Sequence, residues 1–229
     1  MKTYPVFANL IDKPCLVVGG GAVGERKVQD LRVAGARVTV VSPEITPHLA
    51  ELAGAGEIRH LAADFRPEHL DGMALVLAAT DDPAVNARVS AAAQARAIWV
   101  NVADAPELCT FIVPAQVRRG DLTVAISTGG ASPALARKLR EELQQFFGPE
   151  YAPYLALLKG IRERLLADRR GHPDNSRLFH RLVDSPLREA VARGDRAPIL
   201  SLLKEILGAA LSSPVLGDLV ALALAEPRE

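Results

Sequence analysis

The sequence predicts an α/β protein that begins with a parallel sheet, continues into an antiparallel hairpin and ends in helices. Three observations predict this class. The first half contains five short apolar runs, and helical patterns follow the first and the fourth of them, as in repeated βα units. Two further β runs are joined by a short polar turn, which is typical of a hairpin. From residue 150 onward the pattern is helical and poor in strands.

Composition and charge exclude several protein classes. The 229 residues contain 27 Lys and Arg and 27 Asp and Glu, so no net field favours nucleic acid or an anionic membrane. No apolar run reaches the roughly 20 residues of a membrane-spanning helix, and residues 1–5 lack a signal core. Cys15 and Cys109 form no C-x-x-C pair. We therefore expect a cytoplasmic protein with reduced thiols, although the sequence alone leaves a disulfide between them open.

A glycine loop at 19–24 follows the first expected strand and opens a helix expected at 25–34. Gly19, Gly21 and Gly24 fit the G-x-G-x-x-G spacing. The first glycine allows a tight turn, the second lets a pyrophosphate approach the backbone, and the third lets helix and strand pack closely. The amides at the helix N-terminus would face the phosphates. A plain tight turn is the alternative, but this place in the chain favours a Rossmann domain that binds a dinucleotide.

The second expected strand, at 37–41, completes a right-handed βαβ unit. An acidic residue usually follows this strand and binds the adenosine ribose. Here Ser42 follows directly and Glu44 slightly later, and either side chain has the chemistry to bind the ribose. No basic residue stands at this place to meet a 2′-phosphate, although Arg26 and Arg37 are not far away in sequence. The cofactor is therefore expected to be NAD rather than NADP.

Three further strands are expected, at 57–61, 74–79 and 98–101. Thr80 ends the fourth strand and is a candidate cofactor residue. Asp82 either lies beside the nicotinamide or caps the helix expected at 83–96, where Pro83 would take the first position. Val102 and Asp104 follow the fifth strand at the sheet edge where α/β proteins bind ligands. Asp104 is either a catalytic carboxylate or a turn residue that bonds its own backbone.

The hairpin is expected from β runs at 111–117 and 122–126. A loop at 127–132 then leads through Ser132 and Pro133 into a helix that ends near residue 147. We place domain boundaries so that residues 1–113 form the Rossmann domain, 114–148 a central segment and 149–229 a helical domain. The last stretch, 212–229, is either a docking helix or a frayed tail.

Six stretches occur together in a specific order and spacing. They lie at 4–7, 18–27, 79–82, 101–104, 111–114 and 127–133. The most specific are the glycine loop with Glu25-Arg26-Lys27, the N-V-x-D motif ending at Asp104, and S-T-G-G-A-S-P at 127–133. Together they resemble precorrin-2 dehydrogenase, the NAD-dependent module of sirohaem synthase, over roughly residues 1–210.

The resemblance implies a fold and a reaction. It implies a Rossmann domain, a central segment that forms a homodimer and a C-terminal helical domain. The expected reaction is the oxidation of precorrin-2 to sirohydrochlorin with NAD⁺, and some family members then insert Fe²⁺ or Co²⁺. It assigns catalysis to Asp104 and NAD contacts to Ala22, Val23, Pro43 and Glu44. Thr128 stands where the family often has a serine that is phosphorylated in some members, which puts that regulation in doubt here.

The tetrapyrrole substrate carries many carboxylates, so its site should be locally basic. Candidate residues are Arg118 and Arg119 at the hairpin turn, Arg137, Lys138 and Arg140 on the next helix, and the loop residues Ser127, Thr128, Gly129 and Gly130. The alternatives are a solvated basic face and a loop that serves only as turn and helix cap.

Histidines give no sign of a resident metal. The five histidines form no H-x-x-x-H motif or Cys/His cluster, so a metal ion is expected only as a possible substrate. Two other functions compete with the dehydrogenase. One is an NAD(H)-sensing binding module without catalysis, and the other is a different Rossmann oxidoreductase.

Overall fold

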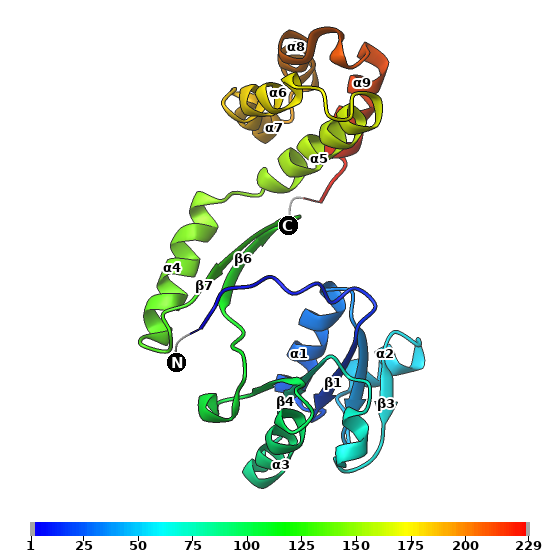
Figure 1. Cartoon of the computed structure of the whole chain (residues 1–229), viewed down its shortest axis with the longest axis vertical. Coiled ribbons are helices and arrows are strands. Elements are labelled where there is room, and N and C mark those ends of the chain that lie inside the picture. Colours follow the sequence, from blue (N-terminus) through cyan, green and yellow to red (C-terminus); the bar gives the residue numbers. More distant parts are fainter. Residues whose placement is uncertain (1–2, 228–229) are drawn as a thin grey trace. The chain divides into compact units, whose positions relative to one another are not determined.

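The structure is a computed structural model in which residues 3–227 are described (Figure 1). The chain divides into two compact units, Met1–Val113 and Pro114–Glu229. The expected fold class is confirmed: a parallel sheet with helices, then an antiparallel hairpin, then helices.

The first unit is built on a five-stranded parallel sheet with strand order β3-β2-β1-β4-β5. Its strands are β1 (Pro14–Val18), β2 (Arg37–Val41), β3 (Arg59–Leu61), β4 (Leu75–Ala78) and β5 (Trp99–Val102). Val18, at the end of β1, pairs with Val41 on one side and with Ala78 on the other. The strand order reverses beside β1, so the carboxyl ends of β1 and β4 form the switch point where such sheets bind ligands.

Three α-helices and one short 3-10 helix connect these strands, and a second 3-10 helix follows β5. They are α1 (Ala22–Val33), α2 (Pro47–Gly54), η1 (Pro67–Leu70), α3 (Pro83–Gln94) and η2 (Pro106–Leu108). One face of the sheet packs Val17 and Val40 against Val28 of α1 and Leu49 of α2. The other face packs a second cluster that includes Val89 of α3. Both faces are covered, which explains why the strands are continuous apolar runs rather than alternating ones.

Helix α1 begins at Ala22, three residues before the predicted start, because the extended residue Gly21 is its N-cap. The third strand is shorter than predicted. Its first predicted residue, Glu57, instead donates its N–H to Leu52 O at 3.0 Å, after the end of α2.

The second unit begins with the hairpin β6 (Ala115–Arg119) and β7 (Leu122–Ile126), in which Val117 pairs with Val124. The predicted first strand of the hairpin, 111–117, is wrong in its first half, because β6 starts only after Pro114. Helices follow as α4 (Pro133–Phe146), α5 (Tyr151–Asp168), α6 (Asp174–Val183), α7 (Leu187–Arg193), α8 (Arg196–Leu207), η3 (Gly208–Ala210) and α9 (Ser213–Leu224).

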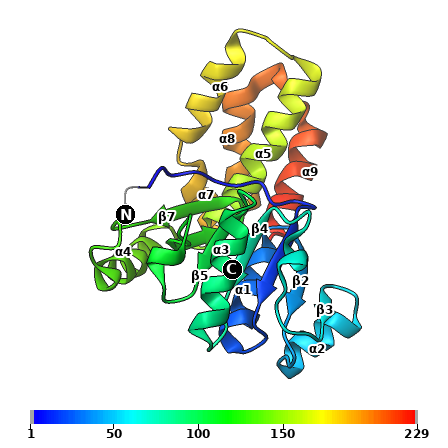
Figure 2. The ribbon, with the colours of Figure 1, turned by 60° about the horizontal axis from the view of Figure 1, so that its bottom comes forward.

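Helices α5 to α9 share one core, whose fully buried members include Leu157, Ile161, Leu203 and Leu216 (Figure 2). Through Leu216 the last helix is part of this core, so residues 213–224 are not a frayed tail. None of the described helices is long and apolar enough to cross a membrane.

Helix α4 differs from the other helices of the second unit. None of its 14 residues is buried, and Leu135 and Phe146 are 47% and 69% exposed. In the hairpin beside it, Val117 is the one buried residue. A helix with a strong apolar stripe that its own chain leaves uncovered is a surface suited to a partner.

Candidate functional site

Two of the three motif glycines after β1 are required by the protein's own packing. Gly19 has φ of +110°, and a Cβ there would lie 2.3 Å from Ala79 O. A Cβ on Gly24 would lie 2.2 Å from Gly19 O, where the first turn of α1 passes over the strand. These are the turn and the close helix–strand approach that the sequence predicts for the first and third glycines of the motif.

Gly21 has no such structural requirement. Its backbone is extended, with φ of −79° and ψ of −174°, which any residue can adopt. A Cβ on Gly21 would meet nothing within 4 Å, and no side chain caps the helix that starts there. The exposed residues Ala22 and Val23 bring the first amides of α1 to this open space. The residues present therefore fit a dinucleotide, because a pyrophosphate needs close approach to the backbone and free N–H groups.

The loop after β2 lies directly against the glycine loop. Thr46 N–H donates to Gly20 O at 3.0 Å, and a Cβ on Gly20 would lie 2.2 Å from Glu44 O. Ser42 is held by Leu61 O, which accepts its N–H at 3.2 Å, and by His60 Nε2, 2.9 Å from its carbonyl oxygen. Pro43 and Glu44 are exposed. The structure thus brings the predicted phosphate and ribose residues together at one edge.

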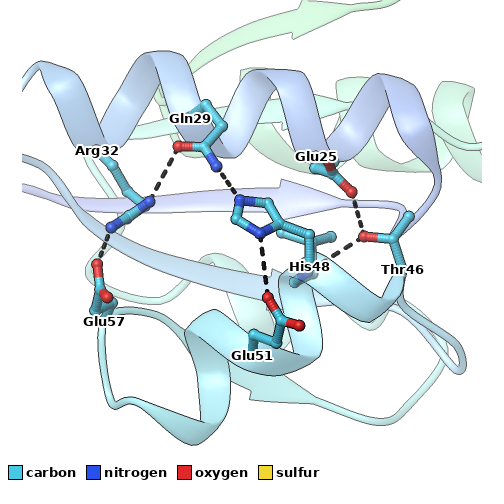
Figure 3. A network of polar contacts seen from close by, with 8 residues as sticks. Glu25, Gln29, Arg32, Thr46, His48, Glu51 and Glu57 are labelled. Atoms are coloured by element: carbon cyan, nitrogen blue, oxygen red, sulfur yellow. Dashed lines mark hydrogen bonds and ion pairs between the residues drawn. The ribbon is translucent and has the colours of Figure 1, made fainter.

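A polar network joins α1 to α2 and the loops around it (Figure 3). Thr46 caps α2 by accepting Leu49 N–H at 3.3 Å, and its hydroxyl donates to the Glu25 carboxylate. Further along α1, Gln29 bonds His48 of α2, and Arg32 is paired with Glu57. These contacts hold α1 against α2 and the loop after β2.

Thr80 lies at the same edge, since a Cβ added to Gly19 would lie 3.1 Å from Thr80 N. Its hydroxyl is 2.9 Å from Asn86 Oδ1 and 3.1 Å from Asp82 O. The Asn86 amide in turn donates to Thr80 O at 2.9 Å. Asp82 is the N-cap of α3, where it accepts Ala84 N–H at 2.8 Å. Asn86 is a buried polar residue that the sequence prediction misses, because a single asparagine inside a helix gives no pattern.

Asp104 follows β5 in a tight turn at the edge of the sheet. Val102 pairs with Ala78, and Ala103 N–H donates to Ala78 O at 2.9 Å. Asp104 is exposed and has φ of +57°, a left-handed conformation that Asp tolerates better than most residues. Within residues 3–227, no hydrogen bond or ion pair involves its carboxylate. The alternative role, a side chain that bonds its own turn, is therefore not what this carboxylate does.

Lys27 of α1 interacts electrostatically with this turn. Burial lowers the pKa of Lys27, the nearby Asp30 charge opposes that shift, and the Asp104 charge opposes it more weakly. The half-buried ammonium thus lies within electrostatic range of the Asp104 carboxylate, on the helix that carries the glycine loop.

The predicted substrate residues lie in the second unit and serve its local structure. Ser127 Oγ accepts Gly129 N–H at 3.1 Å. Thr128 Oγ1 accepts Ser132 N–H at 3.2 Å, and Ser132 caps α4 by accepting Leu135 N–H at 3.2 Å. Gly129 and Gly130 have φ of 62° and 87°, so the loop is a glycine-dependent turn. A substrate-binding role for this loop stays a prediction.

The two arginines of the hairpin differ. Arg119 donates from Nε to Phe147 O at 3.0 Å and from Nη2 to Gln144 O at 3.2 Å, so it satisfies the last carbonyls of α4. Arg118 is exposed. On α4, Lys138 and Arg140 approach Glu142 and Glu141 at 3.8 Å each. Arg118 and Lys138 are exposed, whereas Arg119 and Arg140 are partly buried, and a substrate-binding role for any of them stays a prediction. Among residues 3–227, no group of three or more potential ligands could hold a metal ion.

Comparison with known proteins finds relatives that match both units. A putative NAD(P)-binding family model matches residues 6–115, and the model of the sirohaem biosynthesis protein central domain matches residues 119–145. The chain is 42% identical over 227 residues to the sirohaem synthase of Thioalkalivibrio sulfidiphilus, which covers 99% of this chain. The chain is therefore related to sirohaem synthases over nearly its whole length. The NAD(P)-binding match covers the glycine loop and bears out the prediction of a nicotinamide dinucleotide cofactor.

Other sirohaem synthases are similar as well. The chain is 55% identical over 163 residues, 71% of its length, to the sirohaem synthase of Methylobacillus flagellatus. It spans less than half of these relatives, 46% and 35% of their lengths. The solved structure of SirC, precorrin-2 dehydrogenase, superposes with a TM-score of 0.69 and 28% identity, over 89% of this chain and 98% of SirC.

Proposed function

We propose that this chain is a precorrin-2 dehydrogenase that oxidises precorrin-2 to sirohydrochlorin with NAD⁺. The observation that carries the proposal is Asp104, an exposed carboxylate without an internal partner among residues 3–227. It follows β5, whose neighbour β4 lies beside β1 and the glycine loop. The similarity to SirC, a precorrin-2 dehydrogenase, over most of both chains supports this reaction.

The oxidation removes one hydride and one proton from the macrocycle. NAD⁺ supplies the hydride acceptor. We assign its pyrophosphate to the amides of Ala22 and Val23 beside Gly21, and its ribose to Ser42, Pro43 and Glu44. Thr80 and Val102 border the nicotinamide end in this proposal. Asp104 then accepts the proton as general base, so both electrons leave with the hydride.

The substrate's carboxylates need positively charged or N–H donors. For this role we propose Arg118, Arg119 and the loop residues Ser127, Thr128, Gly129 and Gly130. Arg118 is the better candidate of the two arginines, because the Arg119 guanidinium already bonds the end of α4. Arg137, an exposed residue of the first turns of α4, is a further candidate.

We further propose a homodimer formed through the central segment, with the boundaries 114–148 for this segment and 149–229 for the helical domain. The support is the exposed apolar stripe of α4, in which no residue is buried by the chain itself. A second copy would cover the stripe symmetrically. The Arg119 contacts that hold the end of α4 to the hairpin make the segment one unit.

A second activity, insertion of Fe²⁺ or Co²⁺ into sirohydrochlorin, fits the same carboxylate. The metal ion is a substrate here, and metal insertion releases two protons from the macrocycle nitrogens. In this proposal Asp104 accepts one proton, passes it to solvent and then accepts the second, with the macrocycle bound at this edge. Two free cysteines are consistent with the reducing cytoplasm that we propose as the compartment.

The test is a spectrophotometric assay with precorrin-2 and NAD⁺. The chain should form sirohydrochlorin and NADH, and Asp104→Asn should lower kcat by about 100-fold or more while NAD still binds. NAD binding without turnover in the unmodified chain would favour the NAD(H)-sensing module. Unchanged turnover in Asp104→Asn would instead favour a different oxidoreductase mechanism. A separate incubation of sirohydrochlorin with Fe²⁺ or Co²⁺, without NAD⁺ and with a protein-free control, tests metal insertion.

A further inference from the structure

The thiol of Cys109 lies inside the turn that carries Asp104. Its Sγ is 3.1 Å from Val102 N, whose N–H it accepts. The same sulfur lies 3.4 Å from Val102 O and 3.3 Å from Ala105 O, and a thiol proton can be donated to either. One side chain therefore contacts the residues on both sides of the Ala103–Asp104 pair.

The turn has few other bonds of its own. The Ala105 N–H reaches Val102 O only at 3.5 Å, and Asp104 between them has the left-handed φ of +57°. A residue with a side chain is held in that conformation only when its surroundings enforce it. Cys109 is the side chain that supplies bonds within the turn.

The base of the same loop is fixed separately. Thr110 Oγ1 accepts Val100 N–H at 2.9 Å, and Asn101 Nδ2 donates to Phe111 O at 3.1 Å. From α3, Ser90 Oγ donates to Leu108 O at 2.6 Å. These bonds hold the entry and exit of the loop, so the loss of Cys109 would loosen the turn without releasing the loop.

We infer that Cys109 is a positioning residue, whose thiol holds the turn so that the Asp104 carboxylate keeps a fixed place at the cofactor edge. This inference rests on the proposed role of Asp104. A thiol suits the position because sulfur is large enough to reach three backbone atoms and both donates and accepts weakly. An alanine would make none of these contacts, and a serine oxygen would keep the donor and acceptor but reach less far.

The experiment compares Cys109→Ala and Cys109→Ser with the unmodified chain. Cys15→Ala is the matched control, because it removes a buried thiol from β1. Cys15 pairs with Val38 and Leu75 in the sheet, and no hydrogen bond among residues 3–227 joins its thiol to the turn. Three quantities are measured: kcat and KM with precorrin-2, the Kd for NAD⁺, and amide hydrogen exchange at residues 102–105. Hydrogen exchange reports on the turn without any turnover, and therefore separates this inference from the proposed function.

Cys109→Ala should lower kcat by about tenfold, since a small displacement of a catalytic group has effects of this size. The Kd for NAD⁺ should stay within twofold, and exchange at Val102 and at residues 103–105 should become faster. Cys109→Ser should recover part of kcat, and it also serves as the test if the alanine variant does not fold. Unchanged exchange at 102–105, or a kcat within twofold of the original in both variants, would overturn the inference. If the unmodified chain shows no precorrin-2 oxidation, the proposed function fails, and exchange still decides the role of the thiol.

Discussion

Thr46 and Glu25 join the loop after β2 to the first turn of α1. The Thr46 hydroxyl donates to the Glu25 carboxylate in the first turn of α1, and it also accepts Leu49 N–H as the cap of α2 (Figure 3). The Thr46 backbone N–H binds Gly20 O, so the same residue contacts the glycine loop directly. One threonine thus couples the two segments that we propose to hold the phosphates and the ribose.

Thr46→Val removes both side-chain bonds at nearly constant volume. The free energy of unfolding should fall by about 1–2 kcal/mol, because a helix cap and a hydrogen bond to a charged group are both lost. NAD affinity should fall as well, because the loop after β2 loses its side-chain bond to α1 and keeps only the backbone bond to Gly20 O. Urea denaturation and NAD titration measure these effects. Thr46→Ser keeps the hydroxyl and is the control, so equal stability of the valine and serine variants would contradict the role of these bonds.

Gly20 and Gly21 are neighbours with opposite expected responses to an added methyl group. Gly21→Ala should change the free energy of unfolding by no more than about 0.5 kcal/mol, because its Cβ meets no atom of the protein within 4 Å. The same methyl group should lower NAD affinity about tenfold or more, since it occupies the space next to the helix amides. A Gly21→Ala variant that binds NAD normally would show that the pyrophosphate lies elsewhere.

Gly20→Ala should instead destabilise the fold by about 1–3 kcal/mol, because its Cβ would lie 2.2 Å from Glu44 O. Thermal unfolding without cofactor separates this effect from binding. The pair of variants distinguishes a glycine needed for packing from a glycine needed for a ligand.

The left-handed backbone of Asp104 predicts a stability order among its variants. Asp104→Ala should lower the free energy of unfolding by about 1 kcal/mol, because alanine tolerates φ of +57° poorly. Asp104→Asn and Asp104→Gly should not show this loss, because both residues enter that region readily. Chemical denaturation of the three variants provides the measurement. If alanine were as stable as asparagine, the turn would not be held in this conformation in solution.

The buried thiol of Cys15 predicts a loss of stability at high pH. Burial raises the pKa of Cys15 from 9.0 to about 11. The thiol ionises at lower pH in the unfolded chain than in the folded one. Its contribution to the free energy of unfolding is therefore fully present below pH 9 and is lost as the pH rises through 11. The loss attributable to this thiol should reach about 2 kcal/mol by pH 11.

Cys15→Val, which is similar in size and cannot ionise, is the control for this pH dependence. Denaturation curves between pH 8 and pH 11 should fall more steeply for the unmodified chain than for the variant. Lys27 changes the free energy of unfolding in the opposite direction, because its pKa is lowered in the folded state and its deprotonation at rising pH favours folding. Both proteins contain Lys27, so this contribution cancels in the comparison. Parallel curves would show that the thiol is hydrated in the native state.

Local patterns predict much of the first unit. The glycine loop, the strand before it and the capping role of Asp82 all depend on residues adjacent in sequence. Helix α2 is absent from the predicted elements, although Thr46-Pro47 is a helix start signal. The helix has only eight residues, too few to show a clear helical period. The early start of α1 was missed because a glycine N-cap gives no side-chain signal.

The site was predictable only in part, for a physical reason. The position of Asp104 at the sheet edge follows from parallel strand topology. The contacts of Cys109 within the turn, and of Arg119 with the end of α4, depend on how the chain folds back over 7 and 28 residues. No periodicity encodes such contacts. Which residues bind the substrate stays a prediction.

The uncovered stripe of α4 has a consequence for how this segment folds. Isolated helices of 14 residues are marginal in water, and the apolar side chains of α4 are at most partly buried within this chain. If a second copy covers the stripe, ordering of the helix and association become one equilibrium, governed by mass action. The helicity of the segment and the melting temperature should then rise with protein concentration. Circular dichroism of dilute and concentrated samples would measure this directly, and Leu135→Asp should lower the melting temperature most at high concentration.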